Sequence, residues 1–301
     1  MANLVSALAL GTLRPALGTR RSLLPSRPAP TRAVPLEPET GKTVSLDAQQ
    51  LISMARVGSA TVSPDGILAV FEVKEYDFAE KKFDQQLWLM DLAAAETASD
   101  EELREHKHLT LLTSGAQQKF TSVSSPVFSP CGQFVAFLSD RTNETTAVWA
   151  IPVRGPGEAR LLKMFPLSVS DLTWSAATGG IIVSASVYVD VAAAEAGGDA
   201  MAATAKRDKA LEDGNKKLGG LNAVLFKRLP VREWDRWLDA KMKHPFFLPV
   251  KPAAAGGGYV AEDGAAVDLL LGAPTAVPSG AFGGSEDWAL SSRGTPRSWV
   301  T

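Results

Sequence analysis

The sequence predicts an all-β protein, a partial β-propeller of about three four-stranded blades plus the start of a fourth. A tight-turn motif recurs along the chain, and short apolar strands follow it in the same order each time. Repeats of roughly 40 to 50 residues that each hold four strands are typical of propeller blades. The blades are expected at about residues 57–115, 121–165 and 169–272, with the next blade starting within 283–301.

The turn motif opens the first two units. Residues 63–66 read Ser-Pro-Asp-Gly and precede the apolar run 67–71, and residues 129–132 read Ser-Pro-Cys-Gly and precede the run 133–137. Proline presets the φ angle of the second turn position, and glycine tolerates the geometry at the exit. Each motif therefore predicts a hairpin turn between two strands.

The later strands of these two units also match. Residues 87–91 correspond to 148–151, and residues 111–113 correspond to 161–163. The first unit is longer because of the polar stretch 93–108, which is rich in Glu and Ala. Insertions into repeats fall in loops, so this stretch is predicted to be a surface insertion.

The third unit opens at residues 171–175, turns at Gly179-Gly180 and continues through 181–185. Residues 191–220 then break the pattern without a sustained apolar stripe. Such a segment is predicted to form a mobile loop insertion with a short helix. The remaining strands of the unit are expected at residues 223–226, 245–248 and 267–270.

A leader, residues 1–44, precedes the incomplete propeller of residues 45–301. Its first 36 residues hold five arginines and no Asp or Glu, a bias that fits a transit peptide for a plastid or mitochondrion. A disordered leader on a cytoplasmic protein fits this composition equally well. After the leader, residues 46–57 predict a short helix capped by Ser45 or Asp47.

Composition argues against several classes of partner. The formal net charge of −2 predicts no nucleic-acid partner, and no apolar run reaches the roughly 20 residues of a membrane-spanning helix. The single Cys131 excludes an internal disulfide, and its place in a turn argues against a reactive role. His106 and His108 lack a third metal ligand nearby. Residues 256–258 lack the setting of a phosphate-binding loop, so no metal or cofactor is expected.

Three segments carry a more specific likeness. Residues 225–237 read Leu-Phe-Lys-Arg-Leu-Pro-Val-Arg-Glu-Trp-Asp-Arg-Trp, residues 244–246 read His-Pro-Phe, and residues 282–288 read Phe-Gly-Gly-Ser-Glu-Asp-Trp. With the repeated turns, they make residues 46–290 resemble the propeller of the prolyl oligopeptidase superfamily. The likeness is to its acylaminoacyl-peptidases and bacterial-type dipeptidyl peptidases.

The resemblance implies an N-terminal propeller that gates peptide access to a C-terminal α/β-hydrolase domain with a Ser-His-Asp triad. No Gly-x-Ser-x-Gly elbow occurs in the chain, so no catalytic residue is assigned and the chain alone is predicted to be inactive. Three blades do not close a ring, which predicts a fragment of a larger protein. The alternative is a non-catalytic propeller that acts as a protein-interaction module.

The candidate site is the segment between the strands of the third unit. Trp234 and Trp237 lie three apart and would share one face of a helical turn. They either line the substrate channel or the seam with the hydrolase domain, or they pack between blades while the charged residues pair on the surface. His244, which follows this segment, is expected to be a structural or surface residue. The six candidate residues are Arg232, Glu233, Trp234, Asp235, Arg236 and Trp237.

Overall fold

The computed structural model divides the chain into two units, Met1–Ser45 and Leu46–Thr301. The expected leader forms the first unit and lies outside the described residues. All of the following concerns the second unit. The structure describes residues 47–79, 81–114, 122–141, 145–154, 157–175, 179–190, 199–220, 232–233, 236–237, 240–253, 258–279, 283–284 and 287–288.

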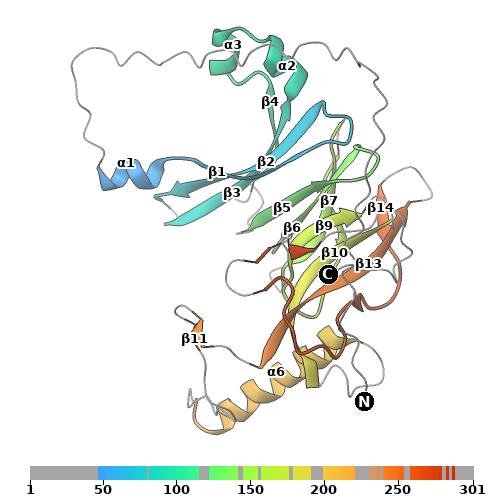
Figure 1. Cartoon of the computed structure of the whole chain (residues 1–301). Coiled ribbons are helices and arrows are strands. Elements are labelled where there is room, and N and C mark those ends of the chain that lie inside the picture. Colours follow the sequence, from blue (N-terminus) through green and yellow to red (C-terminus); the bar gives the residue numbers. More distant parts are fainter. Residues whose placement is uncertain are drawn as a thin grey trace, which may run out of the picture. The chain divides into compact units, whose positions relative to one another are not determined.

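The predicted leading helix is present as α1, Ala48–Ser53 (Figure 1). The Asp47 side chain accepts a hydrogen bond from the Gln50 backbone N–H, and the Gln50 side chain bonds back to the Asp47 N–H. This capping box satisfies two backbone donors that the helix leaves open. The helix is shorter than the predicted span, because the chain is already extended at Arg56.

The first blade is a four-stranded antiparallel sheet whose strands follow in chain order. Its strands are β1 Arg56–Val62, β2 Leu68–Asp77, β3 Lys82–Asp91 and β4 Leu109–Ser114. Two short helices, α2 Leu92–Thr97 and α3 Asp100–Arg104, occupy the connection between β3 and β4. The predicted insertion at 93–108 is therefore correct in place, and it is helical (Figure 1).

The second blade repeats this order with shorter strands and connections. Its strands are β5 Val123–Phe128, β6 Phe134–Ser139, β7 Ala147–Pro152 and β8 Arg160–Lys163. The turns that open the two blades share their hydrogen bonds. The Ser63 hydroxyl accepts from the Leu68 N–H, and the Ser129 hydroxyl accepts from the Phe134 N–H. Both motifs thus form the predicted hairpin turns.

The third blade begins as predicted with β9 Ser170–Ser175 and β10 Gly180–Tyr188. Its third strand is β13, Lys241–Pro252, which pairs with β10 over the whole length of β10. The predicted strand at 223–226 lies outside the described residues. Two short strands, β14 Tyr259–Ala261 and β15 Val267–Asp268, both pair with β13. The predicted strand at 267–270 is thus cut to two residues, and β14 was not predicted.

The connection between β10 and β13 differs most from the prediction. Instead of a loop with a short helix, it contains the 18-residue helix α6, Ala200–Lys217. The two-residue strands β11 Arg232–Glu233 and β12 Arg236–Trp237 pair with each other as a hairpin. Residues 232–233 and 236–237 are thus extended rather than part of a helical turn. We call residues 189–240 the third-blade insertion.

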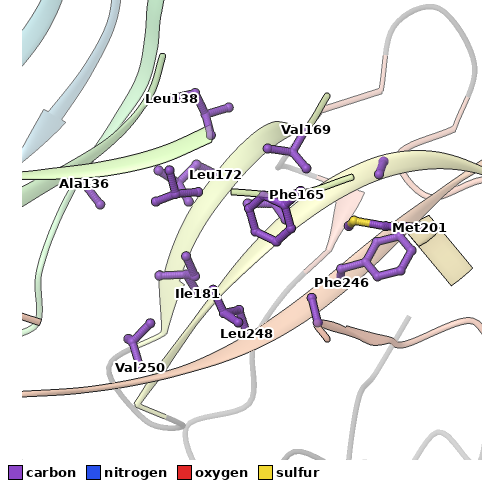
Figure 2. Packing of buried hydrophobic residues seen from close by; sticks show 14 of the residues in the cluster. Ala136, Leu138, Phe165, Val169, Leu172, Ile181, Met201, Phe246, Leu248 and Val250 are labelled. Carbon is purple, nitrogen blue, oxygen red and sulfur yellow. The ribbon is translucent and has the colours of Figure 1, made fainter. Parts of the chain in front are cut away.

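Two apolar clusters join the blades. One packs Leu68, Val70, Leu87 and Leu89 of the first blade against Val135 and Phe137 of the second, with further residues of both. The other joins the second blade to the third, where Figure 2 shows Ala136 and Leu138 facing Ile181 and Leu248, with Leu172 and Phe165 between. Stacking of successive sheets through alternate faces is how propeller blades bury their apolar residues.

Candidate functional site

The candidate residues 232–237 lie in the third-blade insertion, but most of their side chains are outside the described residues. Arg232 is described and exposed. Its partner in the hairpin is Trp237, and Glu233 pairs with Arg236. Trp234 and Asp235 lie outside the described residues.

The base of the insertion is fixed by contacts around Tyr188, the last residue of β10. Its backbone N–H donates to the Thr204 hydroxyl at 3.1 Å, and its own hydroxyl donates to Asp208 at 3.2 Å. The guanidinium of Arg207 stacks over the ring at 4.1 Å and pairs with Asp190 at 2.9 Å. A cation over a partly desolvated aromatic face is attracted by the ring quadrupole.

The same cluster ties α6 to β13. Lys241, the first residue of β13, pairs with Asp208 at 2.8 Å and lies over the Tyr188 ring. Four residues in the first turns of the helix are buried: Ala200, Met201, Ala203 and Thr204. We call Tyr188, Thr204, Arg207, Asp208 and Lys241 the insertion anchor. Sequence reasoning missed it, because its members come from two strands and a helix that lie far apart in the chain.

Beyond the anchor, α6 is exposed. Leu211 and Leu218 are 52% and 68% exposed. Lys216 pairs only one turn back along the helix, with Glu212 at 2.7 Å. In a meander sheet, the connection between the second and third strands leaves at the opposite end from the other two connections. Helix α6 is therefore anchored at its first turns and exposed beyond them, at one end of the third blade.

His244 lies inside β13 and is fully buried. Its Nδ1 is 3.0 Å from Asp268 Oδ2, and its Nε2 is 3.1 Å from the Ala273 carbonyl oxygen. Both ring nitrogens therefore have partners within the blade. These contacts tie β15 and the segment after it to β13. Full burial with a partner at each nitrogen fits a structural residue.

A cavity of about 650 Å³ lies at the other end of the blades. Phe134 and Pro152 of the second blade line it with Tyr259 of the third, and the exposed Arg154 and Glu158 also line it. The ring of Tyr259 meets Phe134 and Trp174 edge to face, with centroids 5.9 Å and 4.7 Å apart. The cavity thus opens where the second and third blades meet.

Cys131 is exposed in this cavity. Its sulfur lies 3.3 Å from the Ser129 hydroxyl and accepts a long hydrogen bond from Tyr259 at 3.5 Å. Partial burial acts to raise the pKa of the thiol, but the bonds from Ser129 and Tyr259 favour the thiolate and leave the pKa below its ordinary value. Burial and the bond to Cys131 raise the pKa of Tyr259 to about 12.

The two histidines of the first-blade insertion, His106 and His108, lie in a turn in which His106 has a positive φ of 55°. In the part of the chain that the structure describes, no three His, Cys, Asp or Glu side chains gather as a metal site would need. Over the same residues, no helix is long and apolar enough to cross a membrane.

Comparison with known proteins finds similar sheet arrangements. The chain matches an AtxE2 isopeptidase in its apo form (14% identity, TM-score 0.42, 71% of this chain and 31% of that one). It also matches an acylaminoacyl peptidase of Pyrococcus horikoshii (10%, 0.40, 68% and 25%) and a putative TolB of Agrobacterium tumefaciens (14%, 0.32, 70% and 50%).

These likenesses are distant, with identities of 10–14% and TM-scores below 0.5. The chain spans about a third or less of the two peptidases and half of the TolB chain. No protein-family model matches the chain, and no curated protein matches it.

Proposed function

We propose that this chain is the propeller part of a serine peptidase of the prolyl oligopeptidase type, which acts on aminoacyl, acylaminoacyl or dipeptidyl ends of peptides. The propeller gates peptide access to a hydrolase domain that these residues do not include. Acyl transfer to the serine of that domain is the chemistry, and no residue of this chain takes part in it directly.

One observation carries the proposal: the segment with the most specific likeness to these peptidases, residues 225–237, belongs to the insertion that the anchor holds. Tyr188 and Lys241 at the two strand ends both bond to Asp208 of α6, so α6 is fixed against the end of the blade. A gate needs such a base, because a surface that selects peptides must keep its position relative to the site behind it.

The decisive experiment extends the chain through the reading frame that follows Thr301 in its transcript. A continuous frame with a Gly-x-Ser-x-Gly elbow and later Asp and His supports the proposal. The extended protein should hydrolyse chromogenic aminoacyl or acylaminoacyl substrates, while the 301-residue chain should not. A stop directly after Thr301 in the verified transcript would contradict the proposal and favour the interaction module.

A matched pair of variants then tests the gate in the extended protein. Arg232→Ala removes an exposed cation from the insertion, and Arg154→Ala removes one from the opposite end of the blades. Loss of one charge-assisted hydrogen bond to a peptide corresponds to about a tenfold rise in KM. We expect this rise for Arg232→Ala alone. Equal KM values for the two variants would show that the insertion does not contact the peptide substrate.

A further inference from the structure

The central hairpin of the first blade is longer than its counterpart in the second. The pair Phe71–Trp88 corresponds to the pair Phe137–Trp149. Pairing of β6 with β7 stops two rows beyond this pair, whereas β2 and β3 pair for four rows more. We call these four rows, residues 74–77 and 82–85, the hairpin extension.

The first row of the hairpin extension places two cations next to each other. Arg56 of β1 lies opposite Lys74 of β2, which lies opposite Gln85 of β3. Opposite residues share a face, so these three side chains form one row across three strands. Like charges directly opposite each other destabilise a sheet. Among the described residues, no carboxylate forms an ion pair with Arg56 or Lys74.

The aromatic ring of Phe83 holds both cations in place. Lys74 Nζ lies 4.7 Å from the ring centroid, and the guanidinium carbon of Arg56 lies 5.5 Å from it. Tyr76, directly opposite Phe83, meets this ring edge to face with the centroids 5.1 Å apart. Attraction to the ring offsets part of the repulsion between the cations, so both charged groups stay at one place.

A recess of about 120 Å³ is lined by all three residues of the row. The Gln85 side-chain oxygen accepts a hydrogen bond from the Val123 N–H at 2.9 Å, so its NH₂ group is the end that remains to donate. Among the described lining residues, Glu72 is the one carboxylate. Its Oε1 accepts from the Ser59 hydroxyl and from the Ser125 N–H, each at 2.7 Å. Two cations and one carboxylate leave the recess with a net positive charge.

The corresponding row of the second blade has a different character. The pair Val57–Val73, one row away, corresponds to Val123–Ser139, so Ser122 and Asp140 stand where Arg56 and Lys74 stand in the first blade. The Ser122 N–H donates to the Asp140 carboxylate at 2.9 Å. The second blade therefore satisfies its carboxylate internally, whereas the first blade presents two cations side by side.

We propose that Arg56, Lys74 and Gln85 bind a carboxylate group of a peptide, either an acidic side chain or the C-terminal carboxylate. Guanidinium and ammonium groups form charge-assisted hydrogen bonds with a carboxylate, and a bound anion removes the repulsion between them. The recess is smaller than the roughly 300 Å³ of a pocket for a whole small molecule, so it takes the charged group alone. The carbon skeleton of the ligand lies against Tyr76 and Phe83.

This inference does not depend on peptidase activity. It goes beyond the proposed function because it assigns a ligand to the first blade, far along the chain from the third-blade insertion. Its test therefore uses binding to the 301-residue chain, and failure of either proposal leaves the other standing.

Binding is measured at low salt by ligand-observed NMR titration with four probes. Acetyl-Glu-Phe-amide carries a side-chain carboxylate, acetyl-Gln-Phe carries a C-terminal carboxylate, acetyl-Gln-Phe-amide is neutral, and inorganic phosphate is the fourth. We expect at least one of the two carboxylate peptides to bind roughly tenfold or more tightly than the neutral peptide, because only a carboxylate forms charge-assisted bonds in the recess. The peptide that binds more tightly identifies the source of the carboxylate.

Lys74→Gln should weaken binding of that peptide roughly tenfold. Lys82→Gln is the matched control, because it removes the same charge from the other face of the hairpin extension and should leave binding unchanged. If circular dichroism shows that Lys74→Gln does not fold, Arg56→Gln at the exposed start of β1 repeats the test.

Three results would each overturn the proposal. The first is that neither carboxylate peptide binds better than the neutral peptide. The second is an equal loss of affinity for Lys74→Gln and Lys82→Gln. The third is inorganic phosphate that binds as tightly as the peptides, which would show a general anion site instead of a carboxylate site.

Discussion

The first and second blades share strand order, opening turn and register, but they bury very different shares of the same face. Strand β5, the first strand of the second blade, has no exposed position, because the second blade has a neighbour on each side. Strand β1 is almost entirely exposed. Local sequence therefore determines the strands and turns of a blade, whereas the stability that each residue contributes depends on the neighbouring blades. Equivalent substitutions in the two blades should therefore differ in cost.

The largest difference is expected at the paired phenylalanines. Phe137 is 0% exposed between the first two blades, and Phe71 holds the same register in the first blade but is only half-buried. Phe137→Ala should lower the free energy of unfolding by about 4 kcal/mol, since it leaves a cavity. Phe71→Ala should cost about 1 kcal/mol, since water already reaches the site. Urea denaturation of both variants measures the two losses of unfolding free energy. Equal losses would contradict the expected difference between the blades.

A smaller contrast is expected at the first strands. Val123→Ala removes two fully buried methyl groups and should cost about 2 kcal/mol, whereas Val57→Ala should stay within about 0.5 kcal/mol. Urea denaturation of both variants measures the two costs, and equal costs would show that burial of this position does not decide its contribution to stability.

The sequence predicts well what short-range chemistry decides. The turns at 63–66 and 129–132 formed as predicted because proline, glycine and a serine hydroxyl act within six residues of chain. The strands of the first two blades followed for the same reason. The capped helix α1 also depends only on Asp47 and Gln50.

Elements whose formation depends on long-range contacts were not predicted from the sequence. Helix α6 has a weak apolar pattern, and its buried first turns rest on Tyr188, Lys241 and their partners. Strand β14 follows a glycine-rich connection and exists because β13 offers it a free edge. The cavity with Cys131 and Tyr259 joins residues 128 positions apart, which no local pattern reveals. The candidate residues Trp234 and Asp235 stay a prediction.

The smallest contrast lies in the two opening turns, which differ at their third residue. Asp65 accepts hydrogen bonds from the Ser63 hydroxyl at 2.5 Å and from the Ile67 N–H at 3.1 Å, and these bonds lower its pKa. Cys131 holds the same place in the second blade and carries no charge in acid. The pH dependence of stability should therefore come from one turn and not from the other.

Because the pKa of Asp65 is lower in the folded chain, its contribution to stability is complete above the unfolded value of about 3.9. The contribution is lost as pH falls through the folded pKa, where both states bind the proton. The free-energy difference between the wild-type chain and Asp65→Asn should thus be constant from pH 7 to about pH 5 and shrink below about pH 4. The difference for Cys131→Ser should stay flat over the same range. Urea melts at a series of pH values measure both, and a pH-dependent difference for Cys131→Ser would show that the turns are not the source of the effect.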